Sequence, residues 1–121
     1  MVSKLVEILQ YRLKPGTGES FHQIMRDISV PLHYQQGIDV IAFGCSRHDA
    51  DSYYLLRAFE SEAQMQSVLE DFYASEAWQR GPREKVIERI EISLKSLLLL
   101  PKSAIDEIRK GFEVSEREYQ L

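Results

Sequence analysis

The chain has 121 residues, of which 44% are hydrophobic and 28% charged, as in an ordinary single globular domain. Its net charge of −4 argues against nucleic acid or an anionic membrane surface as its main partner. One cysteine excludes an internal disulfide, and no apolar run approaches the roughly 20 residues that span a bilayer. With no signal peptide visible, we expect a cytoplasmic protein without a membrane span.

The first part of the chain predicts a strand followed by a helix. β-Branched and aromatic residues indicate a strand over Leu5–Leu13, which Pro15–Gly16 ends. Apolar residues at helical spacing then indicate a helix over Glu19–Gln36, kinked at Pro31 and stopped by Gly37.

A hairpin and a second helical region are predicted next. Ile38–Ser46 and Tyr53–Phe59 are typical of strands, with His48–Asp51 as the turn between them. Ser61 and Gln64 form a capping box that opens a helix.

The predicted chain order ends in a fourth strand and a short helix. Ser75 is placed to cap a helical piece that carries Trp78, and Pro82 to begin another. A strand over Ile90–Leu99 follows. We expect the domain to occupy residues 1–100, and residues 101–121 to form a short helix, Ser103–Lys110, closed by Gly111, and a loosely held tail.

This β-α-β-β-α-β order predicts an α+β fold, the ferredoxin-like plait, in which both helices cover one face of the sheet. Apolar residues nevertheless occupy both faces of the first three strands. Two helices leave the second face uncovered, and such a large apolar patch is unusual on a monomer. We therefore expect a homodimer in which two sheets pack together into a dimeric α+β barrel.

Three segments resemble the NIPSNAP-like family. They are "VEILQYRLKPG" (Val6–Gly16), "YYLLRAFESEAQ" (Tyr53–Gln64) and "FYASEAWQRGPR" (Phe72–Arg83), and the similarity extends over about Leu5–Leu99. The resemblance implies the dimeric α+β barrel. It implies no particular reaction, because the wider superfamily contains cofactor-free monooxygenases, haem-degrading enzymes, isomerases and proteins without known activity.

Four polar side chains on two strands make a candidate ligand site. Glu7 and Tyr11 share one face of the first strand, and Tyr53 and Arg57 share one face of the third. We expect both faces to lie opposite the helices and to line the barrel interior. A small acidic or aromatic ligand would suit such a cavity, with Arg57 pairing an anion, Tyr11 donating a hydrogen bond and Glu7 acting as base. The alternative is a structural ion pair between Glu7 and Arg57, across the strands or between subunits.

Trp78, the only tryptophan, allows two interpretations. As a plug, its ring would fill the end of the plait against Phe72 and Val86. As the wall of a ligand pocket, it would stack against an aromatic substrate, with Arg80 and Arg83 attracting a carboxylate.

The sequence predicts no metal site, no cofactor and no identifiable catalytic residue. His22 and His33 are about three helical turns apart, roughly 16 Å, too far to share a metal ion. They flank the apolar stripe of their helix, and His48 falls in the turn. The stretch "GTGES" (Gly16–Ser20) opens a helix that could bind an anion, but no phosphate-loop lysine accompanies it.

Two functions are therefore open. The first is a homodimeric protein of unassigned activity that binds a small ligand or another protein. The second is a cofactor-free monooxygenase or isomerase acting on a small aromatic or acidic molecule in the barrel cavity. An enclosed cavity lined by Tyr11 and Arg57 would favour an enzyme or a binding protein, and a filled interior would favour a structural role.

Overall fold

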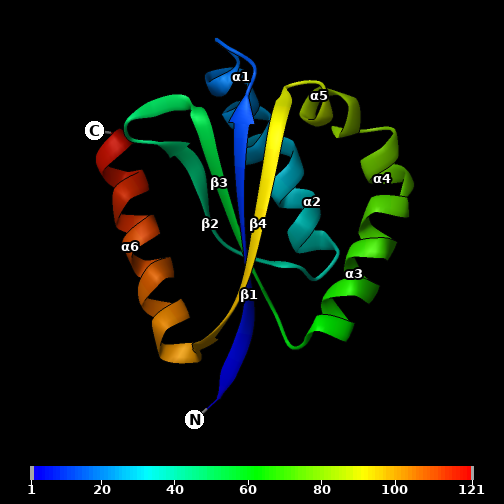
Figure 1. Cartoon of the computed structure of the whole chain (residues 1–121), viewed down its shortest axis with the longest axis vertical. Helices are drawn as coiled ribbons and strands as arrows, with labels where there is room; N and C mark the ends of the chain where they lie inside the picture. The colour runs from blue at the N-terminus through cyan, green and yellow to red at the C-terminus, as the bar shows by residue number, and fades with distance from the viewer. Residues whose placement is uncertain (1, 121) are drawn as a thin grey trace.

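The structure is a computed structural model that describes residues 2–120, with side chains described as far as Glu116. Four strands and seven helical segments follow one another in the predicted order (Figure 1). They are β1 (Ser3–Leu13), α1 (Gly18–Ile24), η1 (Met25–Ser29), α2 (Val30–Gln35), β2 (Asp39–Ser46), β3 (Asp49–Phe59), α3 (Glu62–Ala74), α4 (Glu76–Gln79), α5 (Arg83–Ile87), β4 (Ile90–Pro101) and α6 (Lys102–Gln120).

The four strands form one antiparallel sheet in the order β2-β3-β1-β4. β1 and β3 are central, and β2 and β4 are the edges. This order confirms the ferredoxin-like plait that the sequence predicts. In β1 the buried residues Leu5, Leu9 and Leu13 pack with Phe21 of α1 and Phe72 of α3, so the main core lies between the sheet and these helices.

The first helical region is interrupted before Pro31. Met25–Ser29 form a π-helical segment, and Pro31 follows in the first turn of α2, which continues the same helical run. The irregularity that we expect at Pro31 is therefore real, but it precedes the proline. A π-helix contains more residues per turn than an α-helix, so the segment rotates α2 relative to α1.

The connection from α3 to β4 follows its predicted caps. The Ser61 hydroxyl accepts a hydrogen bond from the Gln64 N–H at 3.1 Å, and the Glu60 N–H donates to the Gln64 side chain. The Ser75 hydroxyl accepts from the Trp78 N–H at 3.3 Å and so opens α4. These caps satisfy N–H groups that a helix start leaves without partners.

The β2–β3 hairpin holds the start of α1. The turn is confined to Arg47 and His48, and Asp49–Asp51, predicted as part of the turn, already belong to β3. Both carboxylate oxygens of Asp51 accept hydrogen bonds, from the N–H groups of Gly16 at 3.0 Å and Gly18 at 2.9 Å. The carboxylate of Asp51 in the same chain therefore occupies the helix start at which the sequence left an anion site open.

Gly18 allows this close approach. A Cβ atom at Gly18 would lie 1.9 Å from the carbonyl oxygen of Ala50, a contact that no larger residue tolerates. The hairpin and the start of α1 are therefore in direct backbone contact.

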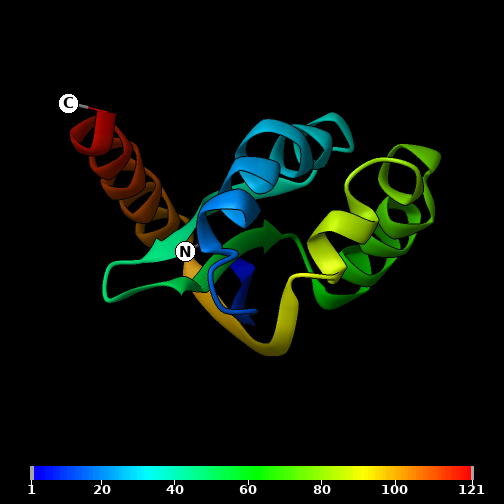
Figure 2. The same cartoon turned by 90° about the horizontal axis from the view of Figure 1, so that it is seen from above.

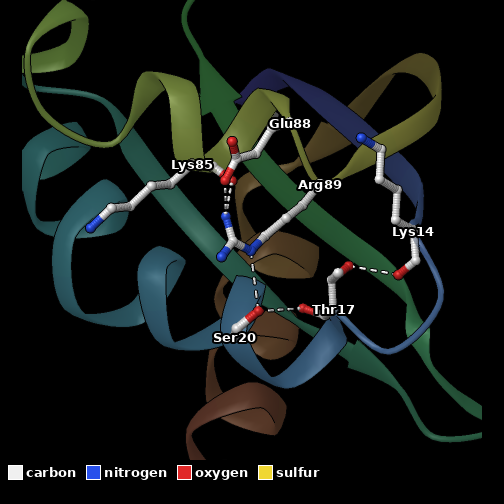
Figure 3. A network of polar contacts seen from close by, with 6 residues as sticks. All are labelled: Lys14, Thr17, Ser20, Lys85, Glu88 and Arg89. Atoms are coloured by element: carbon white, nitrogen blue, oxygen red, sulfur yellow. Dashed lines mark hydrogen bonds and ion pairs between the residues drawn. The ribbon is translucent and has the colours of Figure 1, made fainter.

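A polar network joins the segment between β1 and α1 to Arg89, the residue just before β4 (Figure 3). The Arg89 side chain donates to the Ser20 hydroxyl at 3.1 Å and to the Lys85 carbonyl and the Glu88 carboxylate at 2.8 Å each. The Ser20 hydroxyl donates to the Thr17 carbonyl, and the Thr17 hydroxyl to the Lys14 carbonyl. α1 is thereby fixed from two sides.

The C-terminal helix is longer than predicted. α6 extends through Gly111, which does not have a positive φ, to Gln120, so the expected end at Gly111 is wrong. α6 lies beside β2, apart from the helices that cover the main core (Figure 2). Ile105 is buried in a second cluster with Val6, Ile41 and Ala58 on the other face of the sheet. The second face is thus partly covered within one chain, which the two-helix prediction missed.

β4 remains largely uncovered. Every residue from Glu91 to Leu99 is exposed, including five large apolar side chains. These are Ile92, Leu94, Leu97, Leu98 and Leu99. Within residues 2–120, no helix is both long and apolar enough to cross a membrane.

Candidate functional site

The four predicted strand residues share one face, but it is the face that the helices cover. Glu7 and Tyr11 lie on the same face of β1 as Leu5, Leu9 and Leu13, which pack against α1 and α3. Glu7 lies directly opposite Arg57, and Tyr11 opposite Tyr53, across the β1–β3 pair. The expectation that they face away from the helices is therefore wrong. Because both faces of these strands are apolar, alternation alone does not show which one the helices cover.

Glu7 and Arg57 form a buried ion pair. Their side chains are 0% and 2% exposed, and Arg57 Nε donates to Glu7 Oε1 at 2.6 Å. The other carboxylate oxygen, Oε2, has no hydrogen bond but lies 3.4 Å from the ammonium group of Lys95 on β4. The structural ion pair left open by the sequence is present, and it lies within one chain.

Arg57 continues the network into the helices. Its Nη1 contacts His33 Nε2 at 3.0 Å and the Tyr73 hydroxyl at 2.9 Å. His33 Nδ1 lies 2.7 Å from the Ser29 carbonyl oxygen. A carbonyl can only accept and a guanidinium can only donate, so Nδ1 carries the hydrogen and Nε2 is bare. His33 is therefore a neutral imidazole that fixes the direction of Arg57.

His33 is a site residue that the sequence did not reveal. It is 2% exposed, with its ring 4.4 Å from that of Phe72, whereas an uninterrupted α-helix places it beside the apolar stripe. The intervening π-helical segment rotates it into the core. Burial lowers the pKa of His33 to about 4, opposed by the hydrogen bond to Ser29 and assisted by the nearby charge of Arg57.

Trp78 is buried in the helical layer. It is 6% exposed, its ring centre lies 5.4 Å from those of Phe72 and Tyr73, and Val86 belongs to the same core cluster. This is the environment expected of a plug. Trp78 does not line either of the two hollows described below.

Tyr53 connects the buried face to the surface. Burial raises the pKa of both Tyr53 and Tyr11, so both phenols remain protonated. The Tyr53 hydroxyl lies 2.7 Å from His22 Nδ1 on α1. Burial also lowers the pKa of His22, against the opposing effect of the Glu116 carboxylate. At neutral pH His22 is therefore an uncharged imidazole.

His22 stands in the wall of an open groove, which we call the α1–α6 groove. Its volume is about 980 Å³, and its walls come from α1, η1, the β2–β3 hairpin and α6. The lining residues are Glu19, His22, Arg26, Gly44, Cys45, Ser46, Arg47, Ala50, Tyr54, Phe112, Ser115 and Glu116. A groove of this size can accept a small organic molecule.

A smaller hollow of about 370 Å³ lies where β1, the hairpin and β4 meet. Tyr11 and Tyr53 line it together with Ile92 and Leu94 of the exposed strand. Neither hollow is lined by Glu7 or Arg57, because the side chains of the buried network occupy the space around these two residues.

The fold of this chain is also present in solved structures of other proteins. No protein-family model matches the chain, and no curated protein matches it. The structure is similar to an uncharacterized NIPSNAP domain protein from Burkholderia xenovorans, with a TM-score of 0.68 and 21% identity over 80% of this chain and 93% of that one. It is similar to a NIPSNAP family protein of unknown function from Agrobacterium tumefaciens, with a TM-score of 0.73 and 17% identity over 80% and 87%.

A third similarity extends beyond that family. A protein from Nitrosomonas europaea, provisionally described as an antibiotic biosynthesis monooxygenase, aligns with a TM-score of 0.60 and 15% identity over 78% of this chain and 95% of that one. Identities this low establish the fold alone. The chain thus has the ferredoxin-like fold found in NIPSNAP proteins, as the resemblance in its sequence predicts. Its activity is unassigned.

Proposed function

We propose that this chain is a cytoplasmic, homodimeric protein that binds a small organic ligand in the α1–α6 groove. The observation that carries the proposal is the His22–Tyr53 pair in the groove wall. A neutral imidazole held by a buried phenol is a fixed polar group in the wall of a groove that also carries the aromatic ring of Phe112. Ligand sites commonly hold a few such positioned polar groups beside an aromatic surface.

Of the five residues predicted from the sequence, Tyr53 takes part in this proposal directly. Glu7 and Arg57 act on the binding site indirectly, by stabilising the sheet and the helices above it. Tyr11 borders the smaller hollow, and Trp78 holds α4 against the core. We therefore propose that the ligand binds near Tyr53, which is the predicted site residue in contact with the groove wall.

The exposed β4 strand supports the homodimer. Its exposed apolar side chains lie at one edge of the sheet, with Ile92, Leu94 and Leu98 on the face opposite the main core, and α6 covers only the part of that face nearer β2. A long apolar edge strand also invites association with another chain. We propose that a second copy of the chain covers this surface.

The proposal is tested by native mass spectrometry of protein isolated from its own host. We expect a dimer mass with a small molecule retained, and loss of that molecule in the His22→Phe variant. Gln23→Phe is the matched control, because it adds the same ring to an exposed neighbouring position of α1 outside the groove. Retention that is equal in both variants would overturn the groove assignment.

A second measurement covers a ligand lost during purification. Nuclear magnetic resonance with a library of small aromatic acids, amines and alcohols should shift the His22 ring signals. If no member shifts them and no molecule is retained, the binding function is wrong. If a bound molecule is recovered chemically changed after incubation in air, the chain is a cofactor-free monooxygenase or isomerase instead.

A further inference from the structure

The charged side chains of the α1–α6 groove differ in whether they already form ion pairs within the chain. Arg26 already makes two hydrogen bonds to the carboxylate of Asp27, at 2.9 Å and 3.2 Å. Glu19 and Glu116, by contrast, make no ion pair with any side chain that the structure describes. With Arg26 held by Asp27, the carboxylates of Glu19 and Glu116 are the charges of the α1 and α6 walls that have no direct ion pair among the described side chains, although Glu116 also acts on Arg26 at longer range.

The charges felt at His22 lead to the same conclusion. Those that act on its pKa are the carboxylates of Glu116 and Asp27, which raise it, and the guanidinium of Arg26, which lowers it. The Glu116 carboxylate therefore lies near the imidazole, across the groove on α6. Arg47 is the remaining cation, and it lies on the exposed hairpin turn at the rim.

Aromatic rings lie close to these carboxylates. Phe112 is one helical turn before Glu116 on α6, and its ring centre is 5.2 Å from that of Phe43. Phe43 is in turn 5.8 Å from the His22 ring. An aromatic face binds both apolar rings and cations, so this wall would strengthen the binding of a positively charged aromatic molecule.

We infer that the α1–α6 groove takes an aromatic amine, with its ring against Phe112 and its ammonium group beside Glu116 and Glu19. This inference rests on the ligand-binding function proposed above and specifies its chemical class. It replaces the small acidic ligand that the sequence suggested around Arg57. That guanidinium lies in the core, saturated by Glu7, His33 and Tyr73, and cannot reach a ligand in the groove.

Two probes with the same ring separate the chemical classes. Isothermal titration calorimetry with tryptamine and with indole-3-propionate compares a cation with an anion on an identical indole. We expect tryptamine to bind at least ten times more tightly. Equal affinities, or tighter binding of indole-3-propionate, would overturn the inference.

Charge-removing variants locate the ammonium group. Glu116→Gln should weaken tryptamine binding about fivefold, the effect of losing one partly exposed charge pair. Indole-3-propionate should not lose affinity. Glu113→Gln is the matched control on α6, because its carboxylate acts on Tyr34, away from the groove, and tryptamine affinity should stay the same. An equal loss in both variants would point to the net charge of the protein and contradict the inference.

The experiments also distinguish this inference from the underlying function. If native mass spectrometry shows a retained ligand but tryptamine does not bind, the binding function stands and the amine class is wrong. If neither a retained ligand nor a bound probe is found, both are wrong.

Discussion

Arg57 compensates a carboxylate that has no access to water. Removing it in Arg57→Ala leaves the Glu7 carboxyl group buried without its main partner, with Lys95 3.4 Å away. We expect the free energy of unfolding to fall by about 3–5 kcal/mol, measured by urea denaturation. Arg12→Ala, an exposed arginine of the same sheet, should change it by less than about 1 kcal/mol.

The double variant Glu7→Leu/Arg57→Met tests whether the loss comes from the unpaired charge. Both charges are removed together, so no buried ion lacks a partner, and most of the stability should return. A double variant as unstable as Arg57→Ala would show that the polar network itself, including its bonds to His33 and Tyr73, stabilises the fold.

His33 makes stability depend on pH. Its pKa is about 4 in the folded chain and about 6.5 when unfolded, so only the unfolded chain takes up a proton between these values. Stability should be unaffected above about pH 6.5 and should fall as the pH drops from there to about 4. Urea denaturation at several pH values should show a weaker decline for His33→Gln, which cannot titrate. Parallel pH profiles for the two proteins would contradict the assignment.

Trp78 reports its own environment because it is the only tryptophan. Its fluorescence emission should be blue-shifted and resistant to acrylamide quenching, since the ring is buried against Phe72 and Tyr73. Trp78→Ala should lower the free energy of unfolding by about 3–5 kcal/mol, the usual effect of deleting a buried aromatic ring. Red-shifted, readily quenched emission would contradict the plug.

The individual residues show where sequence reasoning ends. Pairing of Glu7 with Arg57 and burial of Trp78 follow from strand alternation and from the apolar surroundings. The role of His22 does not, because it depends on a contact with a distant strand, and that of His33 does not, because it depends on the rotation of α2 relative to α1. A single π-helical segment changes that rotation and leaves no distinctive residue pattern behind.

Among the elements, α6 gives the clearest test of the structure. Gly111 lies inside this helix, and a Cβ added there would meet nothing within 4 Å. Gly111→Ala should therefore raise the free energy of unfolding by about 0.5–1 kcal/mol, measured by urea denaturation. At Gly37, where φ is +76°, the same change should destabilise the protein by about 1–2 kcal/mol. If Gly111→Ala behaves like Gly37→Ala, the helix ends where the sequence suggests.

The strands and caps of the plait could be predicted because each has a local cause. Ser61, Ser75 and Pro82 act on the residues that follow them. The length of α6 could not, since glycine is a common helix terminator and only contacts with a distant sheet face keep the helix in place. Ile105 provides such a contact with Val6 and Ile41. Val6 is separated from Ile105 by most of the length of the chain.

At the scale of the whole molecule, the exposed β4 surface predicts a homodimer. Sedimentation equilibrium at micromolar concentration should give about twice the chain mass of 14.1 kDa. Leu98→Asp should shift the equilibrium towards monomer, because it places a charge in the apolar surface of β4. Ile87→Asp, a similarly exposed apolar position on α5, should leave the dimer unchanged. A wild-type protein that stays monomeric would refute the predicted assembly.

The position of β1 in the sheet also determines how the chain must fold. β1 precedes the other strands, yet neither of its neighbours is the next strand in the sequence: Glu7 faces Arg57 of β3 on one side and Leu97 of β4 on the other. During synthesis on the ribosome, β1 has no partner strand until β3 has emerged. Its second edge stays unpaired until β4 has emerged as well. Because closing such long loops is slow, contacts of this range predict slower folding than in a helical bundle of equal size. The α1–α6 groove is completed after the sheet, because α6 follows all four strands in the sequence.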